Sequence, residues 1–265
     1  MRILLIRHGE STGNRDHLWA GITDHELTAH GFLQAQRLAE HLRGKLAHCQ
    51  LSIHCSDLTR ARRTAQAIAD VLTDGKLCVD KLLREQDLGW REGLTFKNGD
   101  RKDPVNACKV HTHPGETKDD MNVRAADFIQ SISPLSYSQD KVIVIVSHGL
   151  FLLRLYSELC ASLCIQNAPS AMWSNTGVTT LQINKACSGS VMMVNVTEHL
   201  QGLKRTRGVG SAAYDAKQQK VSSFFSPKRT KRETPATTKD MDELDVRTAI
   251  DAIDAACASS GSRDG

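Results

Sequence analysis

Two histidines occupy matching positions in this sequence, each directly after a short apolar run and each followed by glycine. His8 comes just after Ile3–Ile6, and His148 comes after the apolar run Lys141–Ser147. Open α/β sheets bind ligands outside the carboxyl ends of their strands, so histidines at two such ends predict one shared site. The glycine after each histidine allows the backbone to turn sharply or to approach a ligand closely. The sequence therefore predicts a site centred on His8 and His148.

Two arginines accompany the histidines and indicate what chemistry the site performs. Arg7 precedes His8, and Arg60 lies just beyond the expected strand Leu51–Cys55, again at a carboxyl end. Guanidinium groups match phosphate oxygens bidentately, and neighbouring positive charge keeps a histidine neutral and nucleophilic. The sequence contains no H-E-x-x-H spacing, so metal binding is the weaker interpretation. Two histidines and two arginines together predict a pocket for a transferring phosphoryl group.

The elements that would position these side chains alternate through the first 203 residues. We expect strands over Ile3–Ile6, Leu51–Cys55, Lys141–Ser147, Thr176–Ile183 and Val191–Val196, and helices over Thr28–His41, Leu58–Leu72 and Gly149–Ser162. The pattern of the first helix places Thr28 at its N-cap and includes Phe32 and Leu33 among its apolar positions. This alternation predicts an α/β fold with three layers, in which a mostly parallel central sheet carries helices on both faces.

Six segments in this order resemble the histidine phosphatase superfamily, which contains phosphoglycerate mutases and many phosphatases. They are RHGE at Arg7–Glu10, TDHELTAHGFLQA at Thr23–Ala35, SDLTRA at Ser56–Ala61, LREQDLGWREGLT at Leu83–Thr95, SHG at Ser147–Gly149 and NTGVT at Asn175–Thr179. They span nearly all of residues 1–200. The resemblance implies the phosphoglycerate mutase-like fold and a phosphoryl transfer that needs no cofactor and no metal.

The resemblance also implies a role for each matched position. His8 would accept the phosphoryl group and become phosphohistidine, while Glu85 would protonate the leaving oxygen and later activate water. Arg7, Arg60 and His148 would hold the equatorial oxygens. The further positions expected to bind the substrate are Asn14, Thr23 and Gly149. These roles agree with the chemistry, since phosphoryl transfer needs positioning and neutralised charge, and an alkoxide leaves poorly unless an acid protonates it.

The residues after the expected acid favour a phosphatase over a mutase. Mutases of this superfamily typically continue with a stretch like E-R-H-Y-G-x-L, whereas this chain reads EQDLG from Glu85. Segments His111–Ile132 and Asn195–Arg207 resemble the TIGAR-type fructose-2,6-bisphosphatases, although Gly115 stands alone where that group usually has two glycines. We expect a small phosphorylated metabolite as substrate, either a sugar bisphosphate such as fructose 2,6-bisphosphate or a phosphoglycerate. A mutase remains the alternative activity.

The character of the sequence changes after residue 203. We expect a phosphatase domain over residues 1–203, a basic disordered linker over 204–239, and a short helix with a disordered end over 240–265. Within the linker, QQKVSSFF resembles the PIP-box peptides that dock on the sliding clamp PCNA. Its four defining positions are Gln218, Val221, Phe224 and Phe225. The alternative for this motif is an apolar spot that packs back onto the phosphatase body. The alternative to an enzyme is a binding protein in which the fold serves as a scaffold and the tail recruits the clamp or another partner.

Composition limits the compartment and the partners. The chain has a net charge of +4, eight cysteines without a C-x-x-C pair, and no apolar run long enough to span a bilayer. Its apolar N-terminal run is too short for a signal peptide. We therefore expect a cytoplasmic protein, also nuclear if the PKRTKR cluster acts as an import signal. We expect no membrane partner and no nucleic acid.

Overall fold

Six strands form one mixed sheet in the computed structural model, which describes residues 1–73, 76–96, 113–132, 138–184 and 188–204. The strands are β1 (Arg2–Arg7), β2 (Gln50–Cys55), β3 (Cys78–Val79), β4 (Lys141–Ser147), β5 (Val178–Ile183) and β6 (Gly189–Val196). Their order across the sheet is β3-β2-β4-β1-β5-β6. β1 to β4 run parallel, and β5 pairs antiparallel with both β1 and β6. The expected mostly parallel sheet is confirmed.

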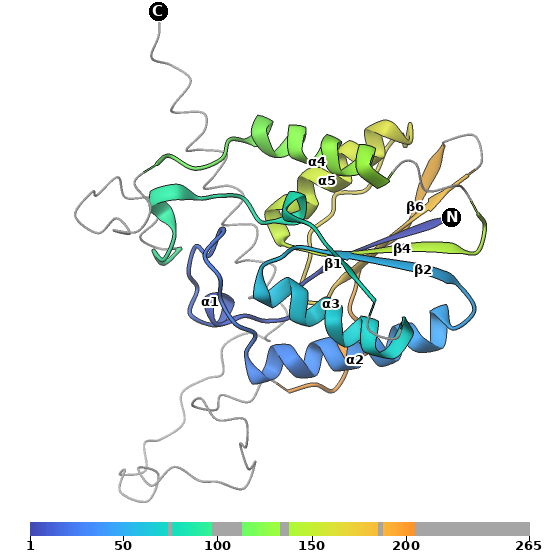
Figure 1. Ribbon diagram of the computed structural model, residues 1–265, viewed down its shortest axis with the longest axis horizontal. Coiled ribbons are helices and arrows are strands. Elements are labelled where there is room, and N and C mark those ends of the chain that lie inside the picture. The colour runs from blue at the N-terminus through green and yellow to red at the C-terminus, as the bar shows by residue number, and fades with distance from the viewer. Residues whose placement is uncertain (74–75, 97–112, 133–137, 185–187, 205–265) are drawn as a thin grey trace, which may run out of the picture.

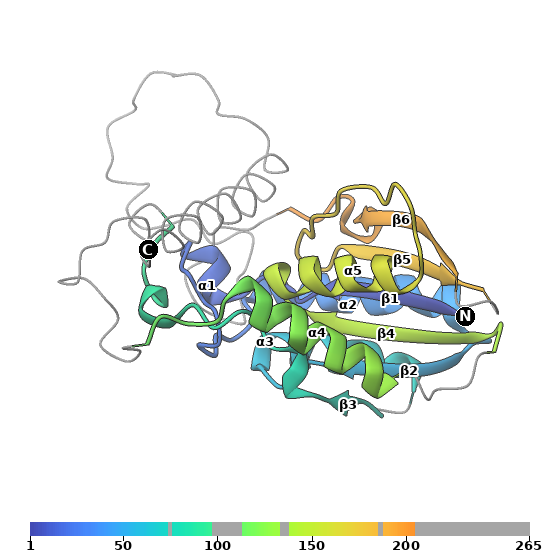
Figure 2. The same cartoon turned by 90° about the horizontal axis from the view of Figure 1, so that it is seen from above.

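Helices cover both faces of this sheet (Figures 1 and 2). The helices are α1 (Thr12–Arg15), α2 (Ala29–Leu46), α3 (Thr59–Leu72), α4 (Lys118–Ile132) and α5 (Gly149–Ser162), with short 3-10 turns η1 (Lys81–Leu83), η2 (Gly89–Arg91) and η3 (Glu198–Leu200). Figure 2 shows α4 and α5 together on one face, and Figure 1 shows α2 and α3 together on the other. Among the described residues, no helix is both long and apolar enough to cross a membrane.

The two faces of β1 belong to two separate parts of the hydrophobic core. Ile3 and Leu5 pack with the apolar side chains of α4 and α5, whereas Leu4 and Ile6 pack with those of α2 and α3. Successive side chains of a strand point to opposite faces, so a strand covered on both sides must be apolar throughout. This explains why the central strands read as continuous apolar runs. The three-layer prediction is confirmed.

The expected bounds of the elements mostly agree with the observed ones. β4 and α5 begin and end where the sequence predicts, and the Thr28 side chain caps α2 by accepting from the Gly31 amide at 3.0 Å. α2 runs past the expected end at His41 to Leu46. β5 begins two residues later than expected because Thr176 has a positive φ of 58°, which is incompatible with a strand.

The expected apolar face of α2 is wrong at its first turn. Phe32 and Leu33 are 42% and 48% exposed. The loop after β1 crosses this turn so closely that a Cβ on Gly31 would lie 2.1 Å from the Glu10 carbonyl oxygen, and Gln34 Oε1 accepts from the Glu10 amide at 2.8 Å. Contact with the loop therefore decides which side of this turn is buried. The predicted linker beyond Lys204, its clamp-binding motif and the predicted terminal helix lie outside the described residues.

Candidate active site

The two histidines predicted to share a site lie side by side at the carboxyl ends of β1 and β4. These strands are neighbours in parallel register, with Arg7 opposite Ser147, so the residues that follow them are also adjacent. The rings of His8 and His148 have centroids 5.0 Å apart. The chain leaves β1 toward α2 on one face and leaves β4 toward α5 on the other. Such a switch point opens a crevice at the edge of the sheet, where α/β proteins bind their ligands.

His8 is held as a neutral imidazole with one nitrogen ready for attack. It is 4% exposed, and its Nδ1 lies 2.7 Å from the Gly9 carbonyl oxygen. Since a carbonyl only accepts, Nδ1 carries the proton and the neutral ring has its lone pair on Nε2. Burial, together with the positive charges of Arg60 and Arg7, lowers the pKa of His8 well below its ordinary value of 6.5. The arginines thus lower the pKa of His8 as expected, although burial is the larger cause of the shift.

His148 contributes a second neutral imidazole. The residue is fully buried, and neither ring nitrogen has a hydrogen-bond partner within the described part of the chain. Burial and the charge of Arg60 lower the pKa of His148 well below 6.5. Buried polar groups are nearly always hydrogen-bonded, and an exception calls for an explanation. A ligand oxygen beside His8 would supply the missing partner.

The two predicted arginines are both fixed at the site by backbone carbonyls. Arg60, in the first turn of α3, is 1% exposed and donates from Nη1 to the Thr23 carbonyl at 2.8 Å and from Nη2 to the Gly21 carbonyl at 2.6 Å. Arg7 donates from Nη1 to the Trp173 carbonyl at 2.8 Å. Burial lowers the pKa of Arg60 to about 10, so its guanidinium is charged at neutral pH.

The predicted acid Glu85 lies at the N-terminus of α5. Its Oε2 accepts from the Leu150 amide at 3.1 Å and its Oε1 from the Phe151 amide at 2.9 Å. These are free amides of the first helical turn, where a carboxylate is favoured. Gly149, the first residue of α5, lines the same pocket as Glu85. The helix that follows His148 thus brings the carboxyl group to the histidine pair.

An arginine that the sequence analysis did not single out holds the turn that carries Glu85. Arg124 of α4 donates to the carbonyls of Leu82 at 2.8 Å, Arg84 at 2.7 Å and Glu85 at 3.3 Å. Arg124 also donates two hydrogen bonds to the Glu116 carboxylate, at 2.8 and 2.7 Å. A guanidinium fork suits such a multiple contact. An internal arginine of a helix gives no sequence signal of this role.

Thr23 lies next to Arg60, which donates to its carbonyl, and it is not among the described residues that line the pocket. Its hydroxyl and its amide both donate to Glu92, the amide at 2.7 Å, and Glu92 also accepts from the Ile22 amide at 2.8 Å. Glu92 is fully buried. No pattern in the sequence identifies this residue. Glu92 therefore fixes the loop whose carbonyls hold Arg60.

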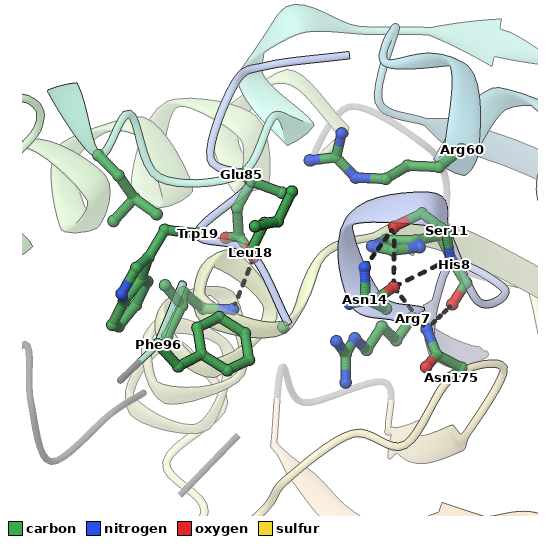
Figure 3. Close-up of a pocket in the computed structure, with 14 residues that line it drawn as sticks. Arg7, His8, Ser11, Asn14, Leu18, Trp19, Arg60, Glu85, Phe96 and Asn175 are labelled. Carbon is green, nitrogen blue, oxygen red and sulfur yellow. Dashed lines mark hydrogen bonds between the residues drawn. The ribbon is translucent and has the colours of Figure 1, made fainter. Parts of the chain in front are cut away.

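Asn14 is positioned at the pocket as expected. Its Oδ1 accepts from the Ser11 amide at 3.1 Å, from the Ser11 hydroxyl at 3.0 Å and from Asn175 Nδ2 at 3.3 Å (Figure 3). Asn175 also donates to the His8 carbonyl at 2.9 Å. This network ties the short helix α1 to the end of β1 and fixes the backbone on which His8 stands.

The pocket over these groups holds about 740 Å³ of space free of protein atoms, part of which is open solvent. Its described lining residues are Arg7, His8, Ser11, Asn14, Leu18, Trp19, Ala20, Arg60, Glu85, Leu88, Phe96, Gly149, Leu150 and Asn175. Five of them form a surface that we call the apolar wall: Leu18, Trp19, Leu88, Phe96 and Leu150. The apolar wall could not be predicted from the sequence, because its members come from three distant segments without a shared pattern.

Comparison with known proteins identifies the family of this chain. The model of the histidine phosphatase superfamily, branch 1, matches residues 3–196. A probable phosphatase of Schizosaccharomyces pombe is 33% identical over 234 residues, covering 84% of this chain and 79% of the relative. A metal-independent phosphoserine phosphatase of Arabidopsis thaliana is 31% identical over 165 residues, covering 59% of this chain and 68% of the relative.

Solved structures show the same fold. A mycobacterial glucosyl-3-phosphoglycerate phosphatase in complex with VO3 superposes with a TM-score of 0.59 at 27% identity, covering 73% of this chain and 98% of that one. A phosphoserine phosphatase of Entamoeba histolytica in complex with 3-phosphoglyceric acid gives a TM-score of 0.58 at 25% identity, covering 75% and 98%. The protein belongs to the histidine phosphatase superfamily and is a phosphatase-like enzyme of its first branch.

Proposed function

We propose that this protein hydrolyses phosphomonoesters in two steps through a phosphohistidine formed on His8. The observation that carries the proposal is the state of His8: a buried neutral imidazole with its lone pair on Nε2, beside two fixed arginines and a second histidine. This arrangement provides a nucleophile together with the positive charge that a transferring phosphoryl group requires.

In the first step, His8 Nε2 attacks phosphorus opposite the ester oxygen. The N–P bond forms while the P–O bond to the alcohol breaks, and the leaving oxygen takes a proton from the Glu85 carboxyl group. Arg7, Arg60 and His148 hold the three remaining oxygens, where negative charge is spread in the transition state. The unpartnered ring nitrogens of His148 support this role.

In the second step, water replaces the alcohol. The Glu85 carboxylate accepts a proton from water, the water oxygen attacks phosphorus, and the N–P bond breaks to return neutral His8 and free inorganic phosphate. The nearby amides of Leu150 and Phe151 stabilise the carboxylate between the two steps. A mutase would instead return the phosphoryl group to another hydroxyl of the same substrate, so the products separate the two activities.

For the substrate we propose a small phosphorylated metabolite. The relatives named above act, by their names, on phosphoserine and on a glucosylated phosphoglycerate, and one was solved with 3-phosphoglyceric acid. Fructose 2,6-bisphosphate is a further candidate because the chain resembles the TIGAR-type enzymes. These compounds form the first panel to be tested.

The test is phosphate release from this panel by wild type, His8→Ala and His48→Ala. His48 is exposed on the surface and serves as the matched control. We expect His8→Ala to lose release completely and His48→Ala to keep it. An alkali-stable, acid-labile phosphoryl label should appear on wild type and not on His8→Ala. Wild-type release that persists unchanged in His8→Ala would contradict the proposal.

Glu85→Gln tests the second role separately. With p-nitrophenyl phosphate, whose leaving group needs no protonation, the variant should release a burst of one equivalent of p-nitrophenol and then turn over slowly. General acid–base catalysis contributes about 100- to 10,000-fold, so the steady rate of the variant should be lower than that of wild type by a factor in this range. A steady rate equal to that of wild type would show that Glu85 does not activate the water.

We also propose that the tail segment Gln218–Phe225 binds a sliding clamp of the PCNA type. Support comes from the sequence pattern alone, in which one glutamine, one aliphatic and two aromatic residues keep the spacing of such peptides. The full-length protein should bind the clamp in calorimetry, and a variant carrying Phe224→Ala and Phe225→Ala should not. Equal binding by the two proteins would exclude this site.

A further inference from the structure

The pocket has two chemically different ends, and the difference indicates the class of substrate. His8, Arg7 and Arg60 lie toward one end, while Glu85 and three members of the apolar wall, Leu18, Trp19 and Phe96, lie toward the other (Figure 3). We infer that the apolar wall binds the leaving alcohol, and that the enzyme prefers monophosphates whose alcohol carries an apolar or aromatic group over bisphosphates. This inference rests on the proposed function, because it assigns one end of the pocket to the transferring phosphoryl group.

The direction in which the alcohol leaves follows from the in-line reaction. The leaving oxygen must lie opposite His8 Nε2 and next to the group that protonates it. Glu85 stands on the side of Leu18, Trp19 and Phe96 in Figure 3, across the pocket from His8. Leu150, whose amide donates to Glu85 Oε2 at 3.1 Å, is itself part of the apolar wall. An alcohol that leaves toward Glu85 therefore leaves along the apolar wall.

The apolar wall is a preformed surface. Residues 17–19 pair with residues 94–96 as in an antiparallel ladder: the Trp19 amide donates to the Leu94 carbonyl at 2.8 Å, and the Phe96 amide donates to the His17 carbonyl at 3.0 Å. The rings of Trp19 and Phe96 meet edge to face, with centroids 5.2 Å apart and an interplanar angle of 75°. A surface fixed by backbone pairing needs little further ordering when a ligand binds to it.

The charges of the pocket disfavour a second phosphate on the alcohol. Within the described lining, the charged side chains are Arg7, Arg60 and Glu85, and Figure 3 shows Glu85 on the side of Leu18, Trp19 and Phe96. A second phosphate there would lose water against apolar side chains and face a carboxylate. An aromatic ring in the same place would instead bury apolar surface that the half-buried Leu18 and Phe96 expose.

Three primary alkyl phosphates test the inference: propyl phosphate, 3-phenylpropyl phosphate and propane-1,3-diyl bisphosphate. Their leaving oxygens are chemically alike, so differences in kcat/KM report how the rest of the alcohol binds. We expect 3-phenylpropyl phosphate to exceed propyl phosphate by about tenfold or more, which is typical for filling an apolar pocket. We expect the bisphosphate to fall below propyl phosphate. A bisphosphate, including fructose 2,6-bisphosphate, that reacts faster than the phenylpropyl ester would overturn the inference.

Variants of the half-buried wall residues connect the preference to this surface. Leu18→Ala and Phe96→Ala should each reduce the ratio of the phenylpropyl rate to the propyl rate by about fivefold or more, whatever they do to either rate alone. Phe96→Arg should raise kcat/KM for the bisphosphate relative to propyl phosphate. A phenylpropyl-to-propyl ratio unchanged in both alanine variants would show that another surface holds the alcohol.

The same assays separate the inference from the proposed function. Hydrolysis of propyl phosphate with the label on His8, but without a phenylpropyl advantage, would overturn the inference and leave the proposed function in place. Absence of both hydrolysis and label with every ester would overturn the two together.

Discussion

Glu92→Gln is the substitution that most directly tests how the fold positions Arg60. The Glu92 carboxylate is fully buried and accepts hydrogen bonds from the Ile22 amide, the Thr23 amide and the Thr23 hydroxyl. Glutamine has almost the same shape, but one carboxylate oxygen becomes an amide nitrogen that cannot accept. The Thr23 amide or the Ile22 amide then faces a donor.

The magnitude follows from these contacts. Leaving one buried donor unsatisfied costs about 1–3 kcal/mol, and weakening the charged hydrogen bonds adds to this. We therefore expect Glu92→Gln to lower the free energy of unfolding by about 2–4 kcal/mol. Because the Gly21 and Thr23 carbonyls hold Arg60, a shift of their loop also moves its guanidinium. A displacement near 1 Å costs about 100-fold in rate, so kcat/KM should fall by roughly 10- to 100-fold.

Urea unfolding and phosphate release at a temperature where both proteins are fully folded would measure the two effects. Glu40→Gln is the matched control, since Glu40 lies on the outside of α2 in an ion pair with Arg43 and its side chain is 55% exposed. The control should change stability by less than about 0.5 kcal/mol. A Glu92→Gln protein with the stability and kcat/KM of wild type would refute the view that this carboxylate organises the Arg60 loop.

Three further predictions concern other parts of the molecule. Burial lowers the pKa of His8 and His148 when the chain folds, so below about pH 6.5 the unfolded chain binds more protons than the folded protein. The free energy of unfolding should therefore fall with falling pH, by up to about 1.4 kcal/mol per pH unit for each histidine. Urea unfolding at pH 7, 6 and 5 would measure this decrease. In the Arg124→Lys variant, the lysine cannot hold three carbonyls and a carboxylate at once, so kcat should fall more than KM changes. An unchanged kcat would show that Arg124 is not needed to position Glu85. Burial raises the pKa of the Cys55 thiol to about 12, so this thiol should not react with a maleimide in the native protein, whereas the exposed Cys78 should. Peptide mapping of the labelled protein would reveal which cysteine is modified.

The positions of the chemical groups along the strands were predictable from the sequence. His8 and His148 each follow an apolar run, and parallel strands end at the same edge of a sheet, so their meeting required no knowledge of tertiary contacts. Arg60 could be placed at the same edge for the same reason. The RHGE, SHG and accompanying motifs further implied the family, and the family model matches residues 3–196.

Local pattern failed where a tertiary contact decides the environment. Phe32 and Leu33 continue an apolar helical pattern, yet the loop after β1 packs on the other side of that turn and leaves both exposed. Glu92 looks in the sequence like an ordinary charged loop residue, but the fold buries it completely beneath the loop that holds Arg60. No periodicity distinguishes either case, because the partner comes from a distant segment.

The sequence by itself therefore determined the class of fold and the groups that we propose to handle the phosphoryl group, because these follow strand ends and carry recognisable motifs. Only the tertiary structure decided the burial of His8, which lowers the pKa of its imidazole, and the carboxylates and arginines that hold the loops around it. It also assembled the apolar wall from three segments far apart in the chain. The physical reason is that reactive groups are specified by residue type, whereas their protonation, orientation and surroundings arise from contacts between distant parts of the chain.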